Sequence, residues 1–119
     1  MNAQQKENLI NGGINVEEAL VRFMGNEAMM EKYLNRFLNE KSFAALAQAV
    51  AADDQEAAQA AAHTLKSVCG TIGCDAMHQL VVAQEAAMRA GDWAKAVTMM
   101  PEIQASYDNI CSTLKANLQ

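Results

Sequence analysis

Residues 61–74 have the sequence AAHTLKSVCGTIGC, in which one histidine stands among alanines, with a lysine three positions later. At about 100° per residue, a helix through this stretch places its apolar side chains opposite His63. That apolar side is formed by Ala57, Ala58, Ala61, Leu65, Val68, Cys69 and Ile72. The polar side, centred on His63, carries Glu56, Gln59, Lys66, Ser67 and Gly70. We therefore expect a two-faced helix that packs by one face and presents His63 to solvent on the other.

Capping signals and glycines divide the chain upstream of this helix. Residues 1–12 form a polar lead-in. Asn15, with Glu18 three positions later, makes a capping-box pattern, so a short helix is expected to begin there and to end at Gly25. A longer helix follows, and its apolar positions change face near residues 39–42, which predicts a bend or a break there.

The downstream segments have similar signals. Asp53 or Asp54 can cap the central helix, and the helix after it is expected to end at Gly91. The last apolar stripe keeps its phase across Pro101, so this proline should bend the final helix without ending it. Together the segments predict an all-α, antiparallel up-down four-helix bundle with an additional short N-terminal helix, forming one domain over residues 13–119.

The composition favours helices and argues against several classes of protein. Apolar residues make up 51% of the chain, and one proline with six glycines is too little for a turn-rich β fold. The net charge of −5 argues against a nucleic-acid partner, because phosphate contacts need clustered lysine and arginine. With no signal peptide, no membrane-length apolar run and three cysteines without framework spacing, we expect a cytoplasmic protein that does not bind membranes.

The surroundings of His63 suit phosphoryl chemistry. Lys66, one helical turn later, can offer an ammonium to an anion attached to the imidazole. Ser67 and Gly70 are small, so the surface beside the ring is flat and open to another protein. Imidazole is nucleophilic near neutral pH, where much of it is uncharged. No Gly-rich phosphate loop is present, and an idle surface histidine would show the same helical pattern.

AAHTLKSVCGTIG resembles the H-x-L-K-G/S…G signature of histidine-containing phosphotransfer (HPt) domains, the intermediates of multistep two-component phosphorelays. INVEEALVRFMGNEAMMEKYLNRFL upstream and MRAGDWAKAV downstream are similar to the same family, so the likeness covers residues 13–118. It implies that His63 is phosphorylated on its outward ring nitrogen and that Lys66 lies beside the phosphate. Ser67 departs from the glycine that many members have after the lysine, but it is also small.

The resemblance also implies a residue on the next helix that hydrogen-bonds the other ring nitrogen of His63. Glu85 matches a position where the family often has an acidic or amide group, and such a bond would fix the tautomer. In the sequence, a surface glutamate without a hydrogen-bond partner would give the same pattern as one that orients His63. Gln84 stands where the family commonly has an apolar core residue, and a buried amide needs partners. If the helix is slightly rotated, Gln84 touches His63 in place of Glu85.

The function that the resemblance implies is that of a phosphocarrier without autonomous catalytic turnover. The chain would accept a phosphoryl group from a receiver-domain aspartate on His63 and pass it to another receiver domain. The implied partners are response-regulator receiver domains and a hybrid sensor histidine kinase, docking over Gln59, Ala60, Ser67 and Gly70. Mg²⁺ is expected on the receiver, with no cofactor in this chain. We also expect a monomer, and a stand-alone protein because the chain begins with Met1 and holds a complete domain.

Two other classes of function compete with this one. The first is an HPt-like interaction module that has lost phosphotransfer, which the presence of both His63 and Lys66 disfavours. The second is a metal site made of His63, Cys69, Cys74 and His78, in which the last two are spaced to share an ion. On the helix that carries both, Cys69 faces the core while His63 points away. The four side chains therefore do not converge, and no metal is expected.

Overall fold

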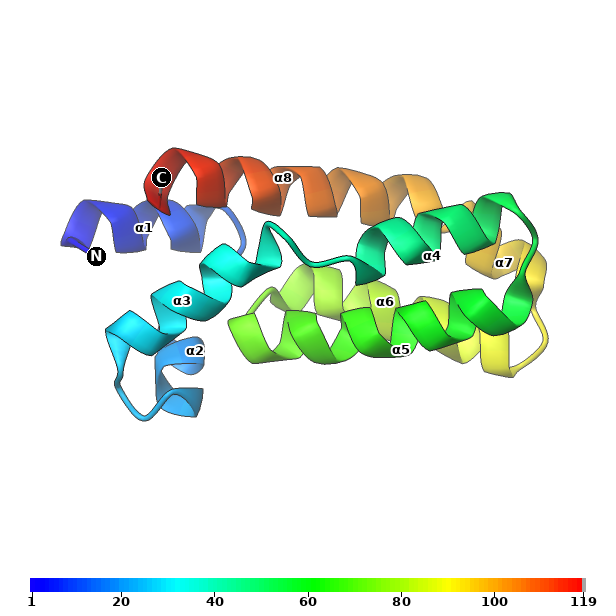
Figure 1. The fold of residues 1–119 in the computed structure, drawn as a ribbon, viewed down its shortest axis with the longest axis horizontal. Coiled ribbons are helices and arrows are strands. Elements are labelled where there is room, and N and C mark those ends of the chain that lie inside the picture. Colours follow the sequence, from blue (N-terminus) through cyan, green and yellow to red (C-terminus); the bar gives the residue numbers. More distant parts are fainter. Residues whose placement is uncertain (119) are drawn as a thin grey trace.

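The computed structural model describes residues 1–118, and all regular structure within that range is helical. The helices are α1 Ala3–Asn11, α2 Val16–Arg22, α3 Glu27–Phe37, α4 Ser42–Ala51, α5 Gln55–Ile72, α6 Asp75–Arg89, α7 Trp93–Thr98 and α8 Met100–Leu118. Helices α4, α5, α6 and α8 run antiparallel in succession, while α1, α2 and α3 lie at one end of the elongated molecule (Figure 1). The expected all-α bundle is confirmed.

Helix α5 packs by the face that the sequence predicts. Its buried side chains are Ala58, Ala61, Ala62, Leu65, Cys69 and Ile72. The three alanines let α4 and α6, the two helices most closely packed on α5, approach its backbone. Of the other residues predicted for this face, Val68 is half-buried and Ala57, in the first turn, is exposed. His63 lies on the opposite face, which the bundle leaves open to solvent.

The ends of α5 follow from local chemistry. Of the two aspartates that could cap the helix, Asp54 does so, since its side chain accepts a hydrogen bond from the backbone of Ala57 at 3.2 Å. At the other end Gly73 adopts φ +79, a left-handed conformation that an L side chain rarely takes. The break expected between the two preceding helices is also present, at residues 38–41.

The capping box expected at Asn15 is only half formed. The Asn15 side chain accepts from the backbone N–H of Glu18 at 3.1 Å, so the predicted cap of α2 is confirmed. The backbone N–H of Asn15, however, donates to the carbonyl of Gly73 at 2.8 Å, and Glu18 bonds the Asn15 side chain instead. The bond from Asn15 to Gly73 therefore connects the start of α2 to the end of α5.

The lead-in of residues 1–12 proves to be mostly helical. Asn2 and Gln5 form a full capping box at the start of α1, and Leu9 is the buried residue of this helix. Gln5 donates to the backbone carbonyl of Asn117 at 2.7 Å, which fixes α1 beside the end of α8 (Figure 1). One buried side chain does not make an amphipathic stripe. The pattern of apolar residues therefore gave no signal for α1.

The prediction that Pro101 bends the last helix without ending it is wrong. Helix α7 ends at Thr98 and α8 begins at Met100, so Met99 separates two helices. Proline has no N–H to donate to the carbonyl of Val97, one turn earlier. The backbone of Met99 stays in the right-handed helical region, which explains why the apolar stripe keeps its phase across the interruption. Within residues 1–118, no helix is both long and apolar enough to cross a lipid bilayer.

Candidate functional site

The imidazole of His63 projects from the middle of α5, with 59% of its side chain exposed. Its Nδ1 atom lies 3.2 Å from Oε2 of Glu85 on the neighbouring helix α6. In contrast, only 3% of the Glu85 side chain is exposed. The imidazole therefore rests one nitrogen against a buried carboxylate and leaves the other, Nε2, on the outer side of the ring.

Two cations share the Glu85 carboxylate with His63. Lys66, on the same helix as His63, donates from Nζ to Oε1 of Glu85 at 2.7 Å. Arg89, one turn further along α6, donates from Nη2 to Oε2 at 3.2 Å. The structure thus brings together three residues predicted from the sequence and one, Arg89, that sequence reasoning missed. The spacing of Glu85 and Arg89, four residues apart on a helix, was the signal that could have revealed it.

The charge state of Glu85 decides which tautomer His63 adopts. Burial raises the pKa of Glu85, but the hydrogen bond and charge of Lys66, with Arg89 and His63, outweigh burial and hold the pKa below its ordinary value. The carboxylate is therefore ionised at neutral pH and can only accept hydrogen bonds. The Nδ1 atom of His63 must carry the proton in this contact, so in the neutral ring the lone pair is on Nε2.

Gln84, the alternative partner for His63, points elsewhere. It is fully buried, and its Nε2 donates to the carbonyl of Ala96 and to the sulfur of Met100, both at 3.0 Å. Its Oε1 has no hydrogen-bond partner among the described residues. Because successive helical residues differ by about 100°, Gln84 faces α7 and α8 while Glu85 faces α5. It is Glu85, and not Gln84, that contacts His63.

The surface around His63 has the small side chains that the sequence suggested. Gln59 and Ala60 line an open hollow beside the imidazole, which Glu85 and Arg89 close on the α6 side. The hydroxyl of Ser67 donates to the backbone carbonyl of His63 at 3.3 Å, so it is turned back onto the helix. This part of α5 therefore offers a partner a nearly bare helix surface next to the ring.

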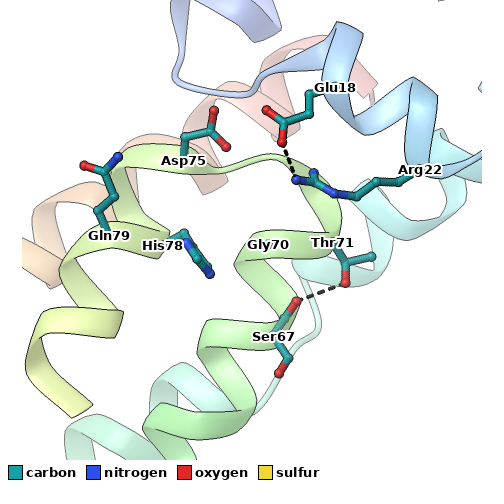
Figure 2. Close-up of a pocket in the computed structure, with 8 residues that line it drawn as sticks. All are labelled: Glu18, Arg22, Ser67, Gly70, Thr71, Asp75, His78 and Gln79. Carbon is teal, nitrogen blue, oxygen red and sulfur yellow. Dashed lines mark hydrogen bonds and ion pairs between the residues drawn. The ribbon is translucent and has the colours of Figure 1, made fainter. Parts of the chain in front are cut away.

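A second hollow begins where α5 continues past Ser67. It is lined by Glu18, Arg22, Ser67, Gly70, Thr71, Asp75, His78 and Gln79, and Figure 2 shows the His78 ring directed toward Gly70. A Cβ added to Gly70 would lie 3.5 Å from that ring, which is an ordinary van der Waals contact. Arg22 is held at the rim by an ion pair with Glu18 at 2.6 Å (Figure 2). Gly70 thus contributes to an open surface rather than to a tight helix contact.

The four candidate metal ligands, His63, Cys69, Cys74 and His78, are not arranged as a metal site. Cys69 and Cys74 are buried, whereas His63 is on the opposite, exposed face of α5. Burial raises the pKa of the Cys69 thiol to about 12, as expected for a side chain that packs in the core. Within residues 1–118, no group of three or more His, Cys, Asp or Glu side chains is placed to hold an ion.

Comparison with known proteins places the chain in a family. A sequence model of the Hpt domain matches residues 29–113, which include His63 and every partner of Glu85. No curated protein and no solved structure matches the chain. The resemblance deduced from the sequence is thereby confirmed. The chain belongs to the Hpt domain family, whose members are the phosphocarrier modules of phosphorelays.

Proposed function

We propose that this chain is a phosphorelay intermediate that takes a phosphoryl group from a receiver-domain aspartate onto Nε2 of His63 and passes it to a second receiver domain. The observation that carries this proposal is the contact between Nδ1 of His63 and the buried carboxylate of Glu85. That contact holds the proton on Nδ1 and directs the nucleophilic lone pair outward, where a partner can reach it.

In the transfer step, the lone pair on Nε2 attacks the phosphorus of the aspartyl phosphate. The Nε2–P bond forms as the P–O bond to the aspartate breaks, and the bonding electrons stay on the regenerated carboxylate of the receiver. The proton on Nδ1 remains in place, so the ring becomes positively charged. The Glu85 carboxylate, 3.2 Å away, stabilises this charge. Transfer to the second receiver is the reverse reaction with a new aspartate.

Lys66 and the receiver would share the neutralisation of the migrating group. The ammonium of Lys66 belongs to the network around His63 and is within a side-chain rotation of the ring. Phosphoryl transfer also requires a divalent cation, and we assign Mg²⁺ to the receiver. The carboxylate closest to His63, Glu85, is already shared by three donors of this chain. The chain therefore contributes imidazole, ammonium and a docking surface.

The docking surface would be the exposed face of α5 on both sides of His63. Gln59 and Ala60 lie one turn before the imidazole, and Ser67 and Gly70 lie one and two turns after it. These side chains are small or uncharged, so a receiver can bring its aspartyl phosphate to the ring without displacing bulky groups. We expect the buried contact area of a receiver to be centred on this strip.

The test is transfer of radiolabel from a phosphorylated receiver domain to the purified chain. Wild type should take up label that is lost in acid and stable in base, as expected for phosphohistidine. The His63→Gln variant should take up none, while its thermal midpoint stays near that of wild type because the side chain is exposed. His78→Gln is the matched control and should label normally. Receiver binding without label would show an interaction module, and label retained on His63→Gln would refute the assignment.

A further inference from the structure

Lys66 is engaged by Glu85 before any phosphoryl group arrives. Its Nζ atom donates to Oε1 of Glu85 at 2.7 Å, the shortest contact of the network. Oε2, the other oxygen, accepts from His63 and Arg89, both at 3.2 Å. The lysine that should stabilise a phosphoryl group on Nε2 is thus paired with the carboxylate on the opposite side of the ring.

Moving Lys66 to a phosphoryl group has an energetic cost at Glu85. With Lys66 in place, only 3% of the Glu85 side chain is exposed, so a departing ammonium uncovers a carboxylate that needs another donor. A buried carboxylate that loses its cation is strongly destabilised unless another donor compensates. Among the described residues, Arg89 is the second cation bonded to this carboxylate. Its guanidinium has five donors, so it can take over the oxygen that Lys66 leaves.

We propose that Arg89 is a positioning residue that replaces Lys66 as the counter-ion of Glu85 when His63 is phosphorylated, and so releases Lys66 to the phosphoryl group. This inference rests on the proposed function and adds a division of labour between the two cations. In the free protein, two cations surround one carboxylate. In the phosphorylated protein there are two anionic groups, and each cation serves one of them.

The position of Arg89 is suited to the role of replacing Lys66 at Glu85. It lies on the same helix as Glu85, one turn away, so its reach to the carboxylate does not depend on the position of Lys66. Its side chain is 57% exposed, which leaves the guanidinium room to shift along the carboxylate. Glu56, in the first turn of α5, lines the same hollow and is the other carboxylate there. It carries no ion pair to Arg89, so Arg89 is committed to Glu85.

The test is a double-mutant cycle between Arg89→Gln and Glu85→Gln, measured on phosphohistidine lifetime and transfer rate with the same receiver. In the wild-type background, Arg89→Gln should shorten the lifetime or slow transfer on the order of tenfold, since Lys66 must then serve both Glu85 and the phosphoryl group. In the Glu85→Gln background the same substitution should have no further effect, because a neutral amide needs no counter-ion. Arg89→Lys, which keeps the charge, should restore most of the loss.

A readout that a purely structural role would not move is the pH profile of the lifetime. In phosphorylated Arg89→Gln, the carboxylate of Glu85 keeps the charged imidazole but has lost a side-chain cation, so it should bind a proton more readily. The acid limb of the profile should therefore move to higher pH, and the move should vanish in the double variant. The thermal midpoint of the unphosphorylated variant should stay near that of wild type, because Lys66 still pairs with Glu85.

The outcomes separate this inference from the function on which it rests. A wild type that takes no label overturns the proposed function and this inference with it. A wild type that labels, with Arg89→Gln unchanged, overturns the inference alone. So does an Arg89→Gln effect of equal size in the Glu85→Gln background, since Arg89 would then act directly on the phosphoryl group or the receiver.

Discussion

Glu85 is the residue on which the geometry at His63 depends. It is buried, ionised and bonded to His63, Lys66 and Arg89 at once, so a single carboxylate fixes the tautomer of the ring and the positions of two cations. An amide at this position would still accept from Nδ1 of His63, but it would attract neither cation. The charge of Glu85 therefore links the resting state of Lys66 to the state of the imidazole.

Removing the Lys66 ammonium should weaken the reaction without abolishing it. A charged hydrogen bond to the phosphoryl group contributes about 1–3 kcal/mol, so Lys66→Ala should slow transfer or shorten phosphohistidine lifetime on the order of tenfold or more. The measurement is the transfer rate from a labelled receiver under single-turnover conditions. Lys115→Ala, at an exposed lysine of α8, is the control and should change neither quantity. If the transfer rate and the phosphohistidine lifetime of Lys66→Ala equal those of wild type, Lys66 has no part in the reaction.

Glu85 should also leave a signature in the pH dependence of stability. Burial raises the pKa of this carboxyl, but Lys66, Arg89 and His63 together bring it below its ordinary value of 4.5, so the folded state holds the ionised form more tightly than the unfolded state does. The stabilisation from Glu85 is complete above the unfolded value and disappears as the pH falls through the lower, folded pKa.

The measurement is urea unfolding of wild type and Glu85→Gln across that pH range. Wild type should lose its advantage over the variant as the pH falls below 4.5, while a difference that does not change with pH would contradict the assigned charge state. Glu56→Gln, at an exposed position on α5, is the control, because it removes a carboxylate that Lys66 and Arg89 do not pair with.

At the scale of single residues, the sequence predicts most of the residues that surround His63. It does not predict which of them bond to one another. The helical spacing put Lys66 beside the ring, and the family likeness pointed to Glu85. The contact between Lys66 and Glu85 joins two helices, and no pattern within one helix contains that information. Arg89 was missed for a related reason, because an exposed arginine near a helix end is ordinary until its partner is known to be buried.

At the scale of the elements, α5 carries both the packing and the site on its two faces. The boundaries that depend on local chemistry, such as the cap at Asp54 and the glycine turn at Gly73, could be predicted from the sequence. The boundaries that depend on distant partners could not. Helix α1 is fixed by bonds from Gln5 and Asn8 to Asn117, more than one hundred residues away along the chain.

The open surface at Gly70 predicts that a long side chain there blocks docking and leaves the fold intact. A Cβ at Gly70 meets only the His78 ring at 3.5 Å, and glutamine is a better helix former than glycine. Gly70→Gln should therefore weaken receiver binding, measured by titration calorimetry, with the thermal midpoint equal to or above that of wild type. Ala57→Gln, exposed about 140° from Gly70 around the same helix, should bind normally. Equal affinities for both variants would move the docking surface away from this strip.

The end of α5 should be far less tolerant than its middle. Gly73 has φ +79, and a Cβ there would lie 2.8 Å from the carbonyl oxygen of Asn15. Gly73→Ala should lower the free energy of unfolding by more than about 1 kcal/mol, because strain and a backbone clash add. Gly91→Ala is the matched control: it has the same φ but nothing within 4 Å, so it should lose less. Equal losses in urea unfolding would show that the contact between α2 and α5 is not tight.

At the scale of the whole molecule, the bundle is a long support, 44 × 25 × 20 Å, that holds the His63 imidazole at its surface. The net charge of −5 disfavours the binding of anions over most of the surface. Lys66 and Arg89, the two cations at Glu85, place positive charge locally beside His63. The all-helical architecture could be predicted because composition, caps and periodicity agree. The break between α7 and α8 at Met99 could not be predicted in this way. A single backbone hydrogen bond lost at Pro101 does not change the spacing of the apolar residues.

This division of labour predicts that the chain does not phosphorylate itself. Incubated alone with ATP and Mg²⁺, the purified protein should neither take up label nor release phosphate, since we assign the cation and the phosphodonor to its partners. Addition of a phosphorylated receiver domain to the same preparation should then give label, which serves as the positive control. Labelling from ATP in a preparation shown to be free of kinase would overturn this reading.

The most direct test of the account is the identity of the nitrogen that carries phosphorus. The chain has two histidines, His63 and His78, so the imidazole signals of the ¹⁵N-labelled protein are few enough to assign by NMR. After phosphorylation by a receiver, a one-bond coupling between ¹⁵N and ³¹P is predicted at Nε2 of His63, with a proton retained on Nδ1. Coupling at Nδ1 of His63, or at either nitrogen of His78, would contradict the role assigned to Glu85.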